Sequence, residues 1–182
     1  MRVGVVAVQG DFLEHEIRLR EQGHEVWEIR RPKDIAPGGN PPDMLVFPGG
    51  ESTVQRKLLA DQELAEPLGS LIDGGVQVMA TCAGLILLAK QVDGRDSPWG
   101  RLDVAVKRNA YGRQLGSFVH GDQVFIRAPA IESVGPGVET LSSIEGRPTA
   151  VRQGNITAYC YHPELAGSGC RCKDTLAKNG KI

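Results

Sequence analysis

Residues 76–89 read VQVMATCAGLILLA, a strand-type apolar run that passes through small residues into a second apolar run. We expect a buried strand over residues 76–80, a sharp turn, and a helix from residue 84 to about residue 90. Such a turn holds its central side chain out from the sheet, as a nucleophile elbow does. That side chain is the thiol of Cys82, at a helix N-terminus whose backbone N–H groups favour the thiolate. A buried structural cysteine is the alternative, which the small neighbours of Cys82 disfavour.

Before this elbow, strand-type runs alternate with helical patterns. The strand-type runs lie at residues 2–9, 25–29 and 44–47. Asp11 can cap a first helix, Ser52 or Thr53 can begin a second, and a further helix lies around residues 63–72. This order of elements predicts a parallel sheet with helices on both faces.

After residue 100, short β-type runs follow one another with Gly or Pro between most of them. They lie at residues 102–107, 123–127, 138–142, 149–153 and 155–161. Residues 153–155, Gln-Gly-Asn, are typical of a tight hairpin turn. We expect these strands to extend one edge of the sheet, some of them antiparallel, rather than to form a separate domain. The fold class is therefore α/β in three layers: a mostly parallel central sheet with helices on both faces and added antiparallel edge strands, in a single domain over residues 1–182.

The composition argues against several classes of protein. Lys and Arg number 21 against 22 Asp and Glu, and aromatic residues make up 5% of the 182 residues. Without a long basic run or an aromatic surface, binding to nucleic acid or to an anionic membrane is not indicated. No apolar stretch is long enough to span a membrane, and residues 1–8 resemble a first buried strand more than a signal segment, so we expect a cytoplasmic protein.

The four cysteines are too few for a disulfide framework. Cys170 and Cys172 could form half of a metal site, but the sequence holds no matching pair. We therefore expect neither a metal ion nor a cofactor.

The second chemical signal is His162-Pro163-Glu164, which follows an apolar strand-type run. His162 and Glu164, two residues apart, lie on one side of an extended chain. Because parallel α/β sheets present their reactive loops at the carboxyl ends of the strands, we expect His162 to lie near Cys82. Thiol, imidazole and carboxylate then make a nucleophile, a general base and a group that orients the base. A packed or surface histidine is the alternative, and we keep that interpretation for the other histidines, His15, His24 and His120.

A glycine pair, Gly49-Gly50, also follows a strand and precedes a helix. Paired glycines often form only a turn, but they also let backbone amides approach a ligand closely. The loop is too short for a phosphate-binding loop and lacks its Lys-Ser/Thr ending, which argues against a nucleotide site. We expect the amides of Gly49 and Gly50, together with those beside Cys82, to be able to bind an oxyanion.

Six motifs together resemble one family of enzymes. They are VQG at residues 8–10, PGGEST at 48–53, TCAGLILLAK at 81–90, RNAYGRQ at 108–114, FIRAP at 125–129 and HPEL at 162–165. From residue 1 to about residue 165, the chain resembles the PdxT/SNO family of class I (triad) glutamine amidotransferases, the glutaminase subunits of pyridoxal 5'-phosphate synthase. PGGEST and RNAYGRQ separate this family from other triad amidotransferases, which share the cysteine elbow and HPE. Residues 166–182 form an atypical C-terminal tail that does not resemble the usual closing helix.

The resemblance implies the class I glutamine amidotransferase fold, which is flavodoxin-like, and a role for each matching residue. Cys82 resembles the nucleophile that attacks the glutamine carboxamide, and His162 and Glu164 resemble the base and its orienter. The implied glutamine pocket contains Gly49, Gly50, Glu51, Arg108, Ile126 and Arg127. The implied oxyanion and activation residues are Gln9, Gly10 and Ala83.

The resemblance also implies a substrate, a partner and a mode of regulation. L-glutamine is the substrate, and ammonia passes to a synthase subunit that condenses it with a pentose phosphate and a triose phosphate to form pyridoxal 5'-phosphate. Glutaminase activity is expected to be low alone and to rise when that subunit binds. Two alternatives stay open: a triad glutaminase that serves another ammonia acceptor, and a catalytically silent docking subunit.

Overall fold

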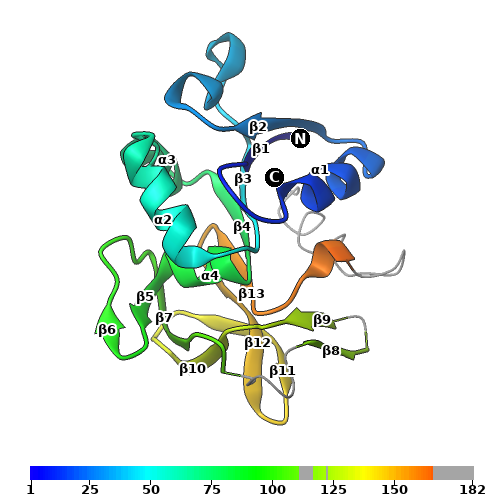
Figure 1. Cartoon of the computed structure of the whole chain (residues 1–182), viewed down its shortest axis with the longest axis vertical. Helices are drawn as coiled ribbons and strands as arrows, with labels where there is room; N and C mark the ends of the chain where they lie inside the picture. The colour runs from blue at the N-terminus through cyan, green and yellow to red at the C-terminus, as the bar shows by residue number, and fades with distance from the viewer. Residues whose placement is uncertain (111–116, 122, 166–182) are drawn as a thin grey trace.

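The computed structural model describes residues 1–110, 117–121 and 123–165. In this part of the chain, seven strands form one sheet in the order β11-β12-β13-β4-β3-β1-β2 (Figure 1). In that order they are β11 (Glu139–Ile144), β12 (Arg147–Gln153), β13 (Ile156–Tyr159), β4 (Gln77–Thr81), β3 (Met44–Phe47), β1 (Arg2–Val6) and β2 (Glu25–Ile29). The strands from β13 to β2 run parallel, while β12 and β11 are antiparallel to their neighbours. The predicted α/β class is confirmed.

Helices cover both faces of the parallel strands. They are α1 (Phe12–Glu21), α2 (Ser52–Asp61), α3 (Ala65–Asp73) and α4 (Ala83–Leu88), with short 3₁₀ turns at Pro32–Asp34, Pro37–Gly39 and Pro163–Leu165. Figure 1 shows α1 on one side of the strands and the other three helices on the opposite side. Every residue of β3 is buried, as expected of a parallel strand with both faces covered. The predicted three layers are therefore confirmed.

The first two long helices begin where the sequence predicts, but the cap of the first differs in its contacts from the prediction. Asp11 is the N-cap of α1, yet its side chain makes no capping hydrogen bond. The second helix, α2, begins at Ser52 as predicted, and the residue before it, Glu51, is its cap: the Glu51 carboxylate accepts hydrogen bonds from the backbone N–H groups of Thr53 and Val54, at 3.3 Å and 2.9 Å. The Asp11 carboxylate instead faces His162.

The chain between α4 and β11 forms two further sheets, so the expectation that all later strands extend the main sheet is wrong. The second sheet has the order β10-β7-β5-β6, and β8 pairs with β9 alone. Their bounds are β5 (Ala89–Val92), β6 (Arg95–Asp96), β7 (Leu102–Lys107), β8 (Ser117–His120), β9 (Gln123–Ile126) and β10 (Ala130–Val134). The helix predicted to run to about residue 90 ends at Leu88, where the chain enters β5 directly.

The physical reason for this second sheet is a turn at Asp93-Gly94. Both residues have positive φ, 50° and 74°, and Val92 pairs with Arg95 across them. An Asp-Gly pair in this conformation is what a two-residue hairpin requires. The chain therefore folds back as β6, and β7 then pairs with β5 instead of joining the main sheet.

The hairpin predicted at residues 153–155 is confirmed, because Gln153 pairs with Ile156 across Gly154 and Asn155. This turn inserts β13 between β12 and β4, parallel to β4. The carboxyl ends of four parallel strands (β1, β3, β4 and β13) consequently lie at one edge of the sheet. Reactive loops in parallel α/β sheets gather at this edge.

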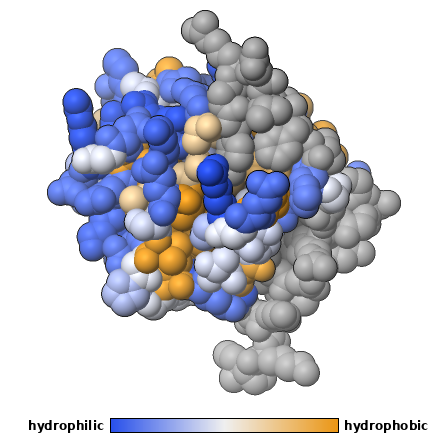
Figure 2. Space-filling view, turned by 90° about the horizontal axis from the view of Figure 1, so that it is seen from below, coloured by the Kyte–Doolittle hydropathy of each residue, from blue (hydrophilic) through white to orange (hydrophobic). Residues whose placement is uncertain are grey.

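The antiparallel end of the molecule has a mainly hydrophilic surface with a smaller hydrophobic area (Figure 2). Single exposed apolar residues such as Val134, 38% exposed on β10, are normal on a folded protein. Among the described residues, no helix has the length and apolar character needed to cross a bilayer. The predicted atypical tail, residues 166–182, lies outside the described residues, as do residues 111–114 of the RNAYGRQ motif.

Candidate active site

The turn predicted between a buried strand and a helix is confirmed at Cys82, which joins β4 to α4. Its backbone has φ 47° and ψ −100°, a conformation that costs energy for a residue with a Cβ and is typical of functional turns. The turn is tight enough that a Cβ at Gly84 would lie 2.2 Å from the carbonyl oxygen of Phe47. The backbone N–H of Cys82 donates to the carbonyl of Tyr159 at 2.8 Å, which ties the elbow to β13.

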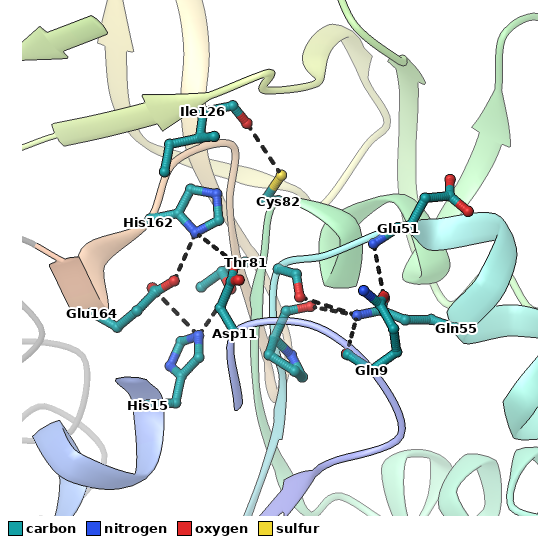
Figure 3. Close-up of polar contacts among 12 residues, drawn as sticks. Gln9, Asp11, His15, Glu51, Gln55, Thr81, Cys82, Ile126, His162 and Glu164 are labelled. Atoms are coloured by element: carbon teal, nitrogen blue, oxygen red, sulfur yellow. Dashed lines mark hydrogen bonds and ion pairs between the residues drawn. The ribbon is translucent and has the colours of Figure 1, made fainter. Parts of the chain in front are cut away.

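His162 and Glu164 lie beside this elbow, as predicted. Nδ1 of His162 is 2.7 Å from Oε1 of Glu164, and both side chains are buried. The carboxylate accepts this hydrogen bond, so the proton of the neutral ring is on Nδ1 and the lone pair of Nε2 is free. Figure 3 shows the imidazole between the carboxylate and the thiol of Cys82. The structure therefore brings together the three groups of the predicted triad.

The thiol itself faces a backbone carbonyl in this geometry. Sγ of Cys82 is 4.0 Å from the carbonyl oxygen of Ile126, at the end of β9 (Figure 3). Nε2 of His162 is buried and has no hydrogen-bond partner among the residues that the structure describes. A buried lone pair without a donor is available to take a proton from a nucleophile that turns toward it.

The electrostatics of the site favour transfer of the thiol proton to this lone pair, which makes the imidazole charged. Burial would lower the pKa of His162, but the neighbouring Cys82 sulfur and the Glu164 carboxylate outweigh burial and raise this pKa to about 10. Burial would raise the pKa of Glu164, but the two histidines that face it, His15 and His162, hold this pKa below its usual value. An imidazolium beside a thiol stabilises the thiolate, the reactive form of cysteine.

Two loops with glycine at their centres border the triad and are joined to each other. Oε1 of Gln9 accepts a hydrogen bond from the backbone N–H of Glu51 at 2.8 Å. Nε2 of Gln55, on α2, donates to the carbonyls of Gln9 and Gly49 at 2.9 Å and 3.1 Å (Figure 3). A Cβ at Gly10, where φ is +102°, would lie 1.9 Å from the Gly49 carbonyl oxygen. The predicted oxyanion loops thus form one packed unit.

Gly49 packs so closely against the imidazole of His162 that a larger residue would not fit there. A Cβ at this position would lie 2.4 Å from Cε1 of His162 and 2.7 Å from Oδ2 of Asp11. The ring is therefore fixed by a backbone surface on one side and by Glu164 through its Nδ1.

Apart from Gly49, the residues predicted to form the glutamine pocket are more exposed than the triad and lie around the start of α2 and the end of β9. Glu51 is exposed, and its pKa is lowered chiefly by the backbone hydrogen bond from Val54. Arg108 forms an ion pair with Asp93, with Nε 2.6 Å from Oδ2, and its Nη1 donates to the hydroxyl of Thr53 at 3.3 Å. These contacts place Arg108 at the start of α2, where it lines a cavity of about 230 Å³.

Ile126 ends β9, Arg127 follows it, and both are exposed. Arg127 has a positive φ of 44°, which is uncommon for a residue with a side chain. The carbonyl of Ile126 is the group that meets the Cys82 sulfur. The end of β9 therefore borders the thiol.

Sequence reasoning missed three residues of the site: Asp11, His15 and Thr81. Oδ2 of Asp11 is 3.4 Å from Nδ1 of His162, and burial raises the pKa of Asp11. His15, which we expected to be a packed or surface histidine, is packed but also faces the triad, because its Nε2 is 3.3 Å from Oε2 of Glu164. The signal was present, since His15 and Leu19 share the buried face of α1 at helical spacing.

One cluster of donor atoms has the spacing of a metal site. An oxygen or nitrogen from each of Asp11, His162 and Glu164 lies within 4.8 Å of the others. The 2.7 Å hydrogen bond between His162 and Glu164 already uses two of these atoms. These contacts orient the imidazole of His162.

Comparisons with known proteins agree with this geometry. The model of the SNO glutamine amidotransferase family matches residues 5–180. A protein of Desulfitobacterium hafniense (strain Y51), named pyridoxal 5'-phosphate synthase subunit PdxT, is 49% identical over 177 residues, which cover 92% of this chain and 87% of the relative. A protein of the same name from Methanocorpusculum labreanum is 47% identical over 174 residues, covering 91% and 90%.

A solved structure, described as a glutamine amidotransferase, superposes with a TM-score of 0.80 at 39% identity and covers 90% of both chains. The match of the family model spans the elbow, both loops and the His-Glu pair, and the relatives cover nearly the whole chain. This protein belongs to the SNO glutamine amidotransferase family.

Proposed function

We propose that this protein is a glutaminase, which hydrolyses L-glutamine to L-glutamate and ammonia through a thioester on Cys82. One observation carries the proposal: a cysteine on a strained strand-to-helix turn lies beside a buried imidazole that is hydrogen-bonded to a buried carboxylate. That arrangement is the nucleophile, base and orienter of acyl transfer. The relatives named pyridoxal 5'-phosphate synthase subunit PdxT support the same function.

The reaction begins when the thiol turns from the Ile126 carbonyl toward Nε2 of His162 and transfers its proton to that nitrogen. The thiolate sulfur bonds to the carboxamide carbon of glutamine, and the carbonyl oxygen takes the negative charge. We expect the amides of Ala83, next to Cys82, and of the Gly49-Gly50 loop, next to His162, to stabilise that charge. The imidazolium returns its proton to the leaving nitrogen, so ammonia departs and a glutamyl thioester remains.

Hydrolysis of the thioester repeats these steps with water. Nε2 of His162 takes one proton from water, and the hydroxide oxygen bonds to the thioester carbon. The C–S bond breaks, glutamate leaves, and the thiolate regains the proton. Glu164 stays ionised throughout and stabilises the imidazolium through Nδ1.

The substrate's charged ends are held by the loop residues at the start of α2. The Glu51 carboxylate, kept ionised by backbone hydrogen bonds, still has lone pairs for the substrate ammonium. Arg108 supplies a cation beside it for the substrate carboxylate, and Ile126 and Arg127 close the opposite side. Gly49 and Gly50 let the backbone approach the ligand.

The partner in this proposal is a synthase subunit that receives the ammonia to make pyridoxal 5'-phosphate. The name of the relatives, a synthase subunit, supports a heteromeric complex. The proposal needs no cofactor, no nucleic acid and no membrane, and it places the protein in the cytoplasm.

Ammonia release from glutamine, measured with and without the cognate synthase subunit, tests this function. The parent protein should release ammonia in the complex, and Cys82→Ser should not, while still binding the synthase. A diazo-oxo-norleucine label should be found on Cys82 by mass spectrometry. Cys160→Ala is the matched control, because Cys160 is fully buried with its pKa raised to about 12 and should be dispensable for labelling. Label on another cysteine, or ammonia release by Cys82→Ser, would refute the assignment.

A further inference from the structure

The carboxylate of Glu164 lies between two imidazoles, not one (Figure 3). Its Oε1 is 2.7 Å from Nδ1 of His162, and its Oε2 is 3.3 Å from Nε2 of His15. The side chains of Glu164 and His15 are 1% and 2% exposed, so water does not stabilise the charge. Oε2 has no hydrogen bond of its own among the described residues, which leaves the His15 N–H dipole as its compensating contact.

His15 reaches the carboxylate from α1, on the opposite face of the sheet from α4 and the elbow (Figure 1). Leu19, one helical turn later, anchors the same face of α1 in the core. The backbone carbonyl of Glu164 also accepts a hydrogen bond from Nε of Arg18 on this helix, at 3.2 Å. α1 thus holds Glu164 at both its backbone and its side chain.

The partners of His15 decide which ring nitrogen carries the proton. Nε2 of His15 is 3.0 Å from the hydroxyl oxygen of Thr81 and 3.3 Å from the carboxylate oxygen of Glu164. A lone pair on Nε2 would face a carboxylate oxygen and be repelled by it, so Nε2 carries the hydrogen. This N–H points at the Thr81 hydroxyl and presents its positive end to the carboxylate.

Burial keeps His15 neutral in this role. Burial lowers its pKa, and His162 acts in the same sense, whereas Glu164, Asp11 and Glu14 oppose the change. These groups face His15 from α1 and its N-cap, and from the segment after β13. A neutral N–H dipole stabilises the negative charge of Glu164. Because His15 carries no full positive charge, it does not compete with the His162 imidazolium for the ion pair with this carboxylate.

We propose that His15 is a positioning residue for the reaction, which keeps Glu164 ionised and aimed at His162 and so supports the imidazolium–thiolate pair. The inference rests on the proposed function and extends it to a residue outside the triad. Thr81, which shares the His15 proton, is the residue directly before Cys82. The chain of contacts from Cys82 through His162, Glu164 and His15 therefore returns to the strand that carries the nucleophile.

The test compares His15→Leu, which removes the N–H dipole at similar volume, with His15→Gln, which keeps an N–H at a similar reach. In the synthase complex, His15→Leu should lower kcat by roughly ten- to a hundredfold with KM for glutamine little changed. His15→Gln should restore most of this loss. Leu19→Ala is the matched control on the same face of α1, because it destabilises the core without touching Glu164.

The pH profile separates positioning from a merely structural role. Without His15, the buried carboxylate of Glu164 holds a proton more strongly, so the acidic limb of kcat/KM should move to higher pH in His15→Leu. Leu19→Ala should lower the folded fraction and leave the limb in place. An unshifted limb in folded His15→Leu, or a His15→Gln variant as impaired as His15→Leu, would overturn the proposal.

A second readout keeps this inference distinct from the glutaminase proposal. The rate at which iodoacetamide alkylates Cys82, followed by mass spectrometry across pH, reports the thiolate whether or not glutamine is the substrate. His15→Leu should shift this alkylation profile to higher pH as well. If the parent releases no ammonia, the glutaminase proposal fails, and the alkylation profiles still decide the role of His15. Should His15→Leu not fold, His15→Gln decides: near-parental profiles support the proposal and a full shift refutes it.

Discussion

Of the side chains of His162 and Glu164, only that of His162 is proposed to exchange a proton with the nucleophile and the substrate. In the proposed mechanism, Nε2 of His162 moves the proton, whereas Glu164 acts through Nδ1 on the far side of the ring. Loss of the imidazole removes the general base. Loss of the carboxylate charge leaves the base in place but removes the stabilisation of its protonated form.

We therefore expect His162→Ala to abolish glutamine hydrolysis and Glu164→Gln to retain measurable turnover. The amide of Gln can still accept the Nδ1 hydrogen bond, so orientation is partly kept while the charge is lost. Steady-state ammonia release, with circular dichroism to confirm folding, measures both. Equal and complete loss in two folded variants would mean that Glu164 does more than orient, and an unchanged rate in His162→Ala would exclude the triad.

At the scale of single residues, sequence reasoning located the three groups of the triad because each stands in a distinctive local pattern. It passed over His15 because an isolated histidine on an amphipathic helix is usually packing. Its contact with Glu164 joins positions 149 apart in the chain, from α1 and from the turn after β13, and no local spacing encodes it. Only the parallel order of the strands brings them together.

Among the elements, α2 has two roles at its first turn. The Glu51 carboxylate caps the helix, and the same group is proposed to hold the substrate ammonium. Glu51→Gln keeps an oxygen acceptor for the cap but loses the charge, whereas Glu51→Ala loses both. We expect Glu51→Gln to raise KM for glutamine with the melting temperature nearly unchanged. Glu51→Ala should add a loss of about 1 kcal/mol in unfolding free energy, typical of a missing cap. Equal glutamine affinity in parent and Glu51→Gln would remove Glu51 from the pocket.

The loops after β1 and β3 suit a gate, because a small set of hydrogen bonds, made by Gln9, Gln55 and the backbone N–H of Asp11, couples them. Oε1 of Gln9 holds the Glu51 amide, and the loops carry the amides proposed for the oxyanion. One misplaced oxyanion donor costs roughly a hundredfold in rate or more. We expect Gln9→Ala to lose stimulation by the synthase while still binding it, and Gln9→Glu, which keeps the acceptor, to be stimulated. Equal hydrolysis by the isolated parent and the complex at saturating glutamine would exclude gating.

The element that sequence reasoning placed wrongly is the chain after α4. The prediction treated every later β-type run as an edge strand, because the sequence of a short strand between Gly or Pro residues does not indicate which strand it pairs with. The Asp93-Gly94 turn was the available signal, since this dipeptide between apolar runs favours a two-residue hairpin. Pairing of β5 with β7 depends on contacts distant in sequence, and periodicity does not encode them.

For the molecule as a whole, the active site makes stability depend on pH. The pKa of His162 is raised from 6.5 to about 10 in the folded state, so its contribution to stability is fully present below pH 6.5 and is lost as the pH rises toward 10. The pKa of Glu164 is lowered in the folded state. Its contribution to stability is therefore fully present at any pH above the usual pKa of a glutamate, and it is lost as the pH falls through the lowered pKa.

We therefore expect the melting temperature of the parent to fall between pH 6.5 and 10 more steeply than that of His162→Gln. Scanning calorimetry of both proteins across this range measures the difference, and lysines and tyrosines common to both cancel in the comparison. Parallel curves for the two proteins would show that His162 is not charged in the folded state.

The contact between Gly84 and the Phe47 carbonyl has a consequence for how this sequence can change. No side chain fits at position 84 without moving the backbone of β3, so random mutagenesis there should leave only glycine after selection for activity. Gly94 is the opposite case: open space surrounds its missing Cβ, and only its φ of +74° resists substitution, so Asn and Asp should survive there. Position 84 should therefore stay glycine among related enzymes, whereas position 94 should vary among residues that tolerate a positive φ.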